Sequence, residues 1–138
     1  MPRILIVDDD KAVRSAIQVL LEHEGFEVVV VESGRSAIEE AARAPIDAAI
    51  VDIVMPGMDG LETIKAFDRS APGVPVVAIS GFMFRDSSAP LPDFLGVAKT
   101  LGAACSLQKP FRPIALLEAL ERCLSQARVR LEAAPAAV

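Results

Sequence analysis

The stretch LIVDDDK, residues 5 to 11, places three aspartates directly after an apolar run. A short apolar run that ends at polar residues is typical of a strand buried in a sheet. Two ionised carboxylates about 4 Å apart repel each other by roughly 4 kcal/mol at an effective dielectric near 20. The stretch by itself therefore has two interpretations: an acidic loop in which water solvates each charge, or a set of ligands for a hard cation.

The composition is that of one globular domain. The chain has 138 residues, of which 52% are apolar and 24% charged, and a net charge of −5. These values exclude wholesale disorder and argue against general nucleic-acid binding, which needs a basic face. No run approaches the length of a membrane span or a signal-peptide core. We therefore expect a cytoplasmic protein without a direct nucleic-acid or membrane partner, and with Cys105 and Cys123 as reduced thiols.

Short apolar runs alternate with helical patterns along the whole chain. The runs predict strands at Ile4–Val7, Glu27–Val31, Ala48–Val51, Val74–Ile79 and Ala104–Leu107. The helical patterns cover Lys11–Glu24, Ser36–Arg43, Leu61–Arg69, Pro92–Leu101 and Pro113–Arg130. Gly25 and Gly102 directly follow two of these helices, where a left-handed residue commonly ends a helix. Strands that alternate with helices predict a doubly wound α/β fold, with a five-stranded parallel sheet and helices on both faces.

Chemically active side chains follow several of the predicted strands. They are Asp8, Asp9, Asp10, Asp52, Ser80 and Lys109. Ligands of such sheets bind beyond the carboxyl ends of the strands, so these residues are expected to lie at one edge. Carboxylates, a hydroxyl and an ammonium group are the components of a site for phosphoryl transfer with a divalent cation.

Four motifs in this order carry a family resemblance: ILIVDDD, VDIVMPGMDG, ISG and LQKPF. The chain resembles a bacterial response-regulator receiver domain of two-component signalling from Arg3 to about Leu124. The resemblance implies the flavodoxin-like strand order 2-1-3-4-5. It also implies a phosphorylation-activated signalling switch that passes its signal by binding another protein.

The resemblance assigns a role to each residue of the site. Asp52 is the implied phosphoryl acceptor, and a sensor histidine kinase or a histidine phosphotransfer protein is the implied donor. Mg²⁺ would be held by Asp9, Asp52 and the backbone carbonyl of Val54, with Asp8 acting through a bound water.

The phosphoryl oxygens have their own implied contacts. Lys109 would pair with them, and the Ser80 hydroxyl would move onto one of them. Pro110 would follow a cis peptide bond, a rare isomer that meets a specific geometric need. Asp10 has no such role and is expected to cap the helix that starts near Lys11.

The chain departs from the family pattern at two places. Ser106 stands where the family usually has an aromatic switch residue, three positions before the site lysine. The segment GFMFRDSSAPLPDF after Ser80 is longer than the usual connection. It is either a tolerated insertion or a replacement switch that uses Phe82 or Phe84.

Other functions stay open at this point. A phosphorelay intermediate or a phosphate sink needs the same chemistry without a large conformational output. A small aspartate-nucleophile phosphatase combines similar residues, but its nucleophile follows the first strand and it carries a cap segment. A receiver that binds partners without phosphorylation is a further possibility. We expect no enzymatic activity beyond self-phosphorylation and self-dephosphorylation.

The predicted receiver domain covers residues 1–130, and residues 131–138 form a disordered tail. Only LEAAPAAV follows Arg130, which is too short for an output domain. We therefore expect a stand-alone receiver similar to the chemotaxis regulators. A trimmed chain that has lost its output domain is the alternative.

Overall fold

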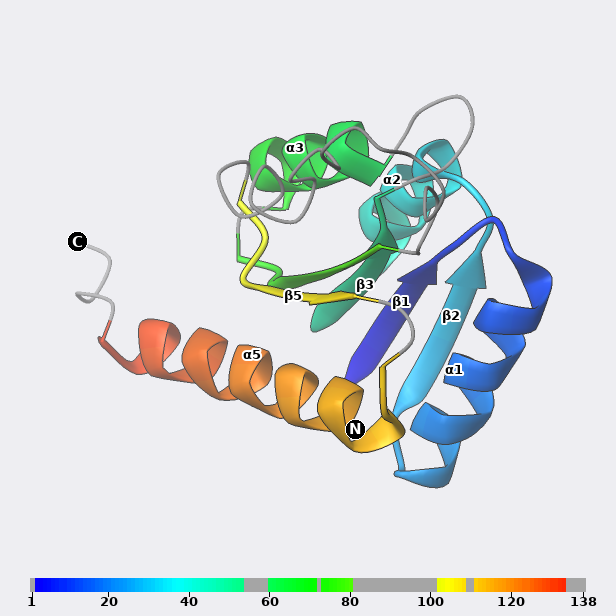
Figure 1. The fold of residues 1–138 in the computed structure, drawn as a ribbon. Coiled ribbons are helices and arrows are strands. Elements are labelled where there is room, and N and C mark those ends of the chain that lie inside the picture. Colours follow the sequence, from blue (N-terminus) through cyan, green and yellow to red (C-terminus); the bar gives the residue numbers. More distant parts are fainter. Residues whose placement is uncertain (1, 54–59, 72, 81–101, 109–110, 134–138) are drawn as a thin grey trace, which may run out of the picture.

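The computed structural model describes residues 2–53, 60–71, 73–80, 102–108 and 111–133. A parallel sheet of five strands in the order β2-β1-β3-β4-β5 forms its centre (Figure 1). The strands are β1 (Arg3–Val7), β2 (Glu27–Val31), β3 (Ala48–Asp52), β4 (Val76–Ser80) and β5 (Cys105–Gln108). The strand order implied by the resemblance is confirmed.

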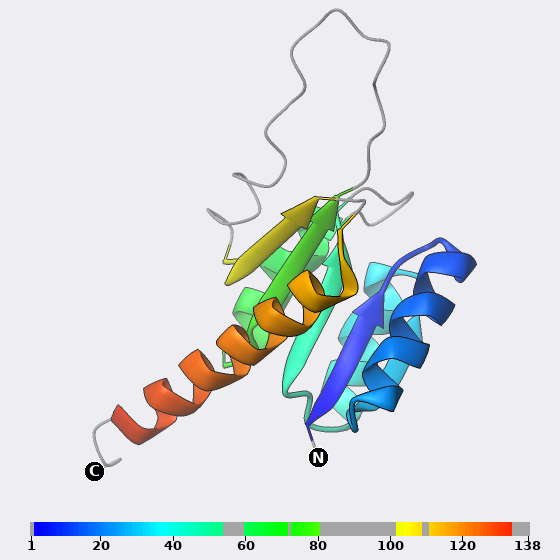
Figure 2. The same ribbon diagram turned by 60° about the horizontal axis from the view of Figure 1, so that its bottom comes forward.

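Helices cover both faces of the sheet, as the doubly wound pattern predicts. They are α1 (Lys11–His23), α2 (Gly34–Arg43), α3 (Gly60–Ser70) and α5 (Pro113–Ala133). Figure 2 shows α1 and α5 in front of the sheet and α2 and α3 behind it. The helix predicted at Pro92–Leu101 lies outside the described residues.

Each central strand is buried on both faces. Successive residues along each strand point alternately into two separate apolar clusters, one on each face of the sheet. The cluster beneath α2 and α3 includes Leu5, Val7, Ala49, Val51, Ile64, Phe67 and Ala78. The cluster beneath α1 and α5 includes Ile4, Ile6, Ile17, Ile50, Ile79, Leu116 and Leu120. Because both faces need apolar side chains, these strands appear in the sequence as unbroken apolar runs.

Side-chain caps set the starts of two helices. The Asp10 carboxylate accepts hydrogen bonds from the backbone N–H groups of Ala12 and Val13, so the predicted cap of α1 is confirmed. Ser33 accepts from the N–H of Ser36 and caps α2. This cap starts α2 at Gly34, two residues before the predicted Ser36.

Two other boundaries differ from the prediction by more than one residue. The predicted strand Val74–Ile79 starts at Val76, because the N–H of Val74 donates to the carbonyl of Ala71 in the turn after α3. The last helix continues to Ala133, beyond the predicted Arg130. At the end of α1, Gly25 has a φ of 91°, which agrees with its predicted helix-ending role.

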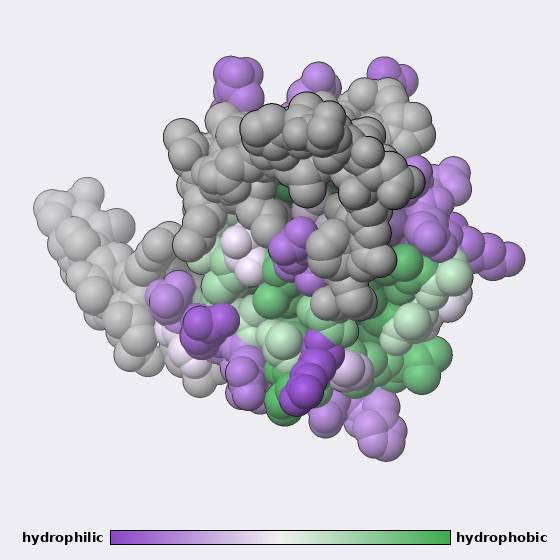
Figure 3. Space-filling view, viewed as in Figure 1, coloured by the Kyte–Doolittle hydropathy of each residue, from purple (hydrophilic) through white to green (hydrophobic). Residues whose placement is uncertain are grey.

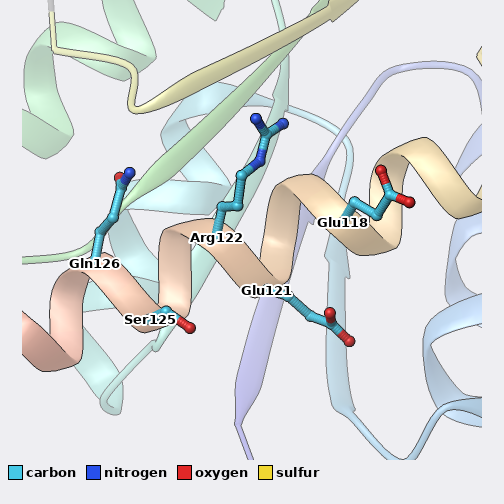
Figure 4. A pocket seen from close by; sticks show the side chains of 5 residues that line it. All are labelled: Glu118, Glu121, Arg122, Ser125 and Gln126. Carbon is cyan, nitrogen blue, oxygen red and sulfur yellow. The ribbon is translucent and has the colours of Figure 1, made fainter.

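Helix α5 has one buried side and one solvated side. Its buried residues are Leu116, Ala119, Leu120 and Cys123. Figure 4 shows exposed polar side chains on the same helix: Glu118, Glu121, Arg122, Ser125 and Gln126. These residues line an open hollow of about 550 Å³. Among the helices that the structure describes, none combines the length and the apolar character that a membrane crossing requires.

Candidate functional site

Three carboxylates meet at the carboxyl edge of the sheet. Asp8 and Asp9 directly follow β1, and Asp52 is the last residue of β3. Val7 pairs with Val51 in the register of these neighbouring parallel strands. Each of the three residues can offer a carboxylate oxygen such that all three atoms lie within 4.8 Å of one another. The predicted convergence of these acids is therefore observed.

The burial of these acids makes their charges costly. Asp8 is fully buried and Asp52 is 5% exposed, whereas Asp9 is exposed to solvent. At 4.8 Å, the ionised carboxylates of the buried pair Asp8 and Asp52 repel by about 3.5 kcal/mol at an effective dielectric of 20, and water screens the charge of the exposed Asp9 more strongly. A cation that binds all three replaces this repulsion by attraction.

The donor set suits a hard divalent cation. Carboxylate oxygens are the ligands that Mg²⁺ and Ca²⁺ prefer, and Mg²⁺ keeps several waters, so few protein ligands suffice. The cluster of Asp8, Asp9 and Asp52 therefore fits the predicted Mg²⁺. Val54, the predicted carbonyl ligand, lies outside the described residues.

The main chain around Asp8 is held by hydrogen bonds. The N–H of Asp10 donates to Asp8 Oδ1 at 2.9 Å, and Arg14 Nη1 donates to the Asp8 carbonyl oxygen at 2.7 Å. The N–H of Asp8 donates to the carbonyl of Val31 on β2. Sequence reasoning missed Arg14, because an arginine in the first turns of an amphipathic helix gives no sign of which backbone group it contacts.

Gly60 allows α3 to start directly against the end of β3. A Cβ atom at this position would overlap the carbonyl oxygen of Asp52 and the Cα of Ile53. Gly60 is buried, and no side chain fits there without a shift of the backbone that carries Asp52. Sequence analysis did not anticipate this close approach.

The remaining predicted residues lie on β4 and β5 or just after them. Ser80 ends β4, is 8% exposed, and pairs in register with Gln108, the last residue of β5. Ser80 is thus one residue beyond Ile79, the register partner of Asp52. Lys109 directly follows Gln108 in the sequence. Lys109, Pro110, Phe82 and Phe84 lie outside the described residues.

Ser106 occupies the centre of β5. Its neighbours Cys105 and Leu107 pack against the cluster beneath α1 and α5. Because Cys105 is adjacent along the strand, Ser106 points to the opposite face of the sheet. The position of the missing aromatic residue therefore lies on the α3 side of β5.

Comparisons of the chain with known proteins all point to the same family. A family model described as the response regulator receiver domain matches residues 4–121. The chain is 33% identical over 129 residues to Response regulator MprA of Mycolicibacterium vanbaalenii, with 94% of this chain and 50% of that protein covered. It is 40% identical over 84 residues to Sensor protein GacS of Pseudomonas syringae, with 57% of this chain and 9% of that protein covered. The chain spans about half the length of the response regulators that it matches.

Solved structures agree with this result. A CheY-like response regulator receiver domain protein from Methanospirillum hungatei superposes with a TM-score of 0.84 at 28% identity, covering 94% of this chain and 98% of that one. Chemotaxis protein CheY4 of Vibrio cholerae gives a TM-score of 0.77 at 32% identity, covering 90% and 99%. These matches favour a signalling domain over the phosphatase alternative.

The acidic cluster predicts that Mg²⁺ stabilises the fold. At a free Mg²⁺ concentration of about 100 times the Kd of the site, the free energy of unfolding of the wild type should rise by about 2.7 kcal/mol. Most of this gain should disappear in Asp9→Asn and Asp52→Asn, whereas Glu22→Gln removes an exposed charge at the far end of α1 and should keep it. Urea unfolding is followed by circular dichroism, because the chain has no Trp or Tyr. An equal Mg²⁺ effect in Asp52→Asn would contradict the metal site.

The close approach at Gly60 predicts a strong effect of one added methyl group. Gly60→Ala should lower the free energy of unfolding by about 1–3 kcal/mol, because its Cβ overlaps the backbone of Asp52 and Ile53. Gly73→Ala is the matched control, since no atom lies within 4 Å of its Cβ position. The same unfolding assay compares them, and similar stabilities of the two variants would show that α3 does not need this contact.

Proposed function

The chain belongs to the response regulator receiver family, and on that premise we propose that it is a phosphorylation-activated switch with Asp52 as the phosphoryl acceptor. The observation that carries this proposal is the cluster of Asp8, Asp9 and Asp52 at the carboxyl edge of the sheet. The cluster combines a nucleophile with ligands for a cation in one place. The phosphoryl donor is a sensor histidine kinase or a histidine phosphotransfer protein.

The transfer itself needs little from the protein beyond position and charge. A carboxylate oxygen of Asp52 attacks the phosphorus of a phosphohistidine, and the bond between phosphorus and the ring nitrogen breaks. The nitrogen keeps the electron pair and takes up a proton, so that the donor leaves as neutral imidazole. The product is an acyl phosphate, which water later hydrolyses back to the Asp52 carboxylate and inorganic phosphate.

The ligands of Mg²⁺ in this proposal are Asp9, Asp52 and the carbonyl of Val54, with Asp8 acting through a water. When bound, the ion neutralises phosphoryl oxygens next to the three carboxylates. Burial of Asp8 and its hydrogen bond from Asp10 keep that carboxylate in place. Arg14 adds a second restraint on the same residue through its backbone carbonyl.

Lys109 and Ser80 complete the proposed site. Ser80 ends the strand next to Asp52, and its register partner Gln108 directly precedes Lys109. This register supports a place for both residues at the same edge as the acids. Lys109 would pair with a phosphoryl oxygen, and the Ser80 hydroxyl would donate to another once the phosphoryl group is bound.

The docking surface that we propose for the phosphoryl donor is a groove between α1 and α5. It holds about 370 Å³ and is lined by Val13, Ala16, Ile17, Leu20, Phe111, Pro113 and Leu116. Figure 3 shows apolar surface, in green, over the α1 side of the molecule. One wall starts at Val13, a few residues after Asp9, and the other starts at Phe111, shortly after Lys109. A donor seated in the groove would therefore lie next to the site.

A phosphorelay intermediate or phosphate sink is the second candidate. Ser106 on β5 favours it, because a serine lacks the bulk with which an aromatic switch side chain reports phosphorylation at the surface. Phosphoryl chemistry at Asp52 is common to both functions. Partner affinity that is equal with and without phosphorylation would favour the relay.

Phosphorylation by a small donor tests the acceptor directly. The protein is incubated with Mg²⁺ and acetyl phosphate, and its intact mass is measured. The wild type should gain one phosphoryl group, and Asp52→Asn should gain none. Asp10→Asn is the matched control, because asparagine keeps the helix cap and Asp10 lies outside the cluster. A phosphoryl group on Asp52→Asn would place the acceptor elsewhere.

A charged substitution in the groove tests whether the phosphoryl donor docks there, because it should weaken docking without changing the chemistry at Asp52. Ala16→Glu places a carboxylate on an exposed position of the groove, and phosphotransfer should fall by about tenfold, equivalent to 1.4 kcal/mol of lost binding. Ser15→Glu adds the same charge beside it but outside the groove lining. Rates are measured with the autophosphorylated sensor kinase that acts fastest on the wild type, and with acetyl phosphate as reference. Equal rates for both variants would exclude the groove as the docking surface.

A further inference from the structure

Cys105 and Cys123 form a close thiol pair that the phosphoryl chemistry does not use. They are the two cysteines of the chain, and both are free. Cys105 lies on β5 and is partly exposed, whereas Cys123 lies on α5 and is fully buried. Their sulfur atoms are 3.2 Å apart. The sequence predicted reduced thiols at both positions and gave no sign that the two lie together.

The two side chains already point toward each other. The Cys123 thiol donates a hydrogen bond to Cys105 Sγ, and the Cys105 thiol donates a long one of 3.9 Å to the carbonyl of Ala119. An S–S bond is about 2.04 Å long, so the sulfur atoms need to approach by only about 1.2 Å.

We propose that Cys105 and Cys123 are a redox-sensitive pair that closes reversibly to an intramolecular disulfide when a peroxide reacts with Cys105. The bond would tie β5 to α5. It would also close a loop that contains Ser106 and Lys109, between residues 18 positions apart. The state of the thiols would thereby act on the strand that leads into the proposed phosphoryl site.

The reaction balances with hydrogen peroxide as the oxidant. The thiolate of Cys105 attacks one peroxide oxygen, the O–O bond breaks, and hydroxide leaves and takes up a proton as water. Cys105 is then a sulfenic acid. Cys123 loses its proton and attacks the Cys105 sulfur, the S–O bond breaks, and a second water leaves. Two thiols and one peroxide become one disulfide and two waters.

The environment of each sulfur sets the order of these steps. Burial, and to a smaller extent the hydrogen bond to Cys105, raises the pKa of Cys123 to about 12. Little of this thiol is therefore ionised at neutral pH. Cys123 is also shielded from solvent, whereas Cys105 is partly exposed. Cys105 is therefore the thiol that meets the oxidant, and Cys123 is the thiol that resolves the sulfenic acid.

The test uses the whole chain and needs no phosphorylation, so its failure is distinct from that of the proposed function. Reduced protein is treated with hydrogen peroxide, denatured in N-ethylmaleimide and analysed by intact mass and non-reducing peptide mapping. We expect a monomer that has lost two hydrogens, takes up no maleimide, and contains the Cys105–Cys123 peptide pair. Dithiothreitol should restore two reactive thiols, and the oxidised form should unfold at a higher urea concentration than the reduced form.

Two variants separate the roles of the thiols. In Cys123→Ala, dimedone should trap a sulfenic acid on Cys105 that no partner resolves. In Cys105→Ser, the buried Cys123 should stay reduced under the same treatment. A wild type that accumulates sulfinic acid on Cys105 while Cys123 stays free, or that forms only intermolecular disulfides, would overturn the proposal. This wild-type result decides the question even if a variant fails to fold.

Discussion

The repulsion among three carboxylates at the end of an apolar sheet is the constraint on which the rest of the structure depends. Asp8 and Asp52 are buried within reach of each other, and Asp9 joins them from the solvent side. Such an arrangement is unfavourable in the absence of a cation. The two apolar clusters on either face of the sheet offset this cost, because they hold β1 and β3 in a register that brings the acids together.

Close backbone contacts then limit how far the acids can move apart. Asp10 has two roles, since its carboxylate caps α1 while its N–H donates to the carboxylate of Asp8. Arg14 holds the carbonyl of Asp8 from the next turn of the same helix. Gly60 brings the start of α3 against the backbone of Asp52. The helix starts beside the site thus act as restraints on its ligands, so a substitution that removes one of these contacts is expected to change metal binding as well as stability.

Strand β5 carries one of the two departures of this chain from the pattern of the family. Ser106 replaces the usual aromatic residue on one face of the strand, and Cys105 contacts Cys123 of α5 on the other. In this chain the cysteine pair joins β5 to α5. The contact connects the strand before Lys109 to a helix with a solvated polar side.

The sequence by itself determined the alternation of strands and helices, the acids at the strand ends and the cap at Asp10. Local patterns specify these features, because an unbroken apolar run requires burial on both faces and a short polar side chain satisfies the nearest N–H groups. The strand order came from the family resemblance. Only the tertiary structure decided the contacts of Arg14, Gly60 and the cysteine pair. Each of them joins residues whose meeting depends on how one helix packs against a strand, and no local pattern carries that information.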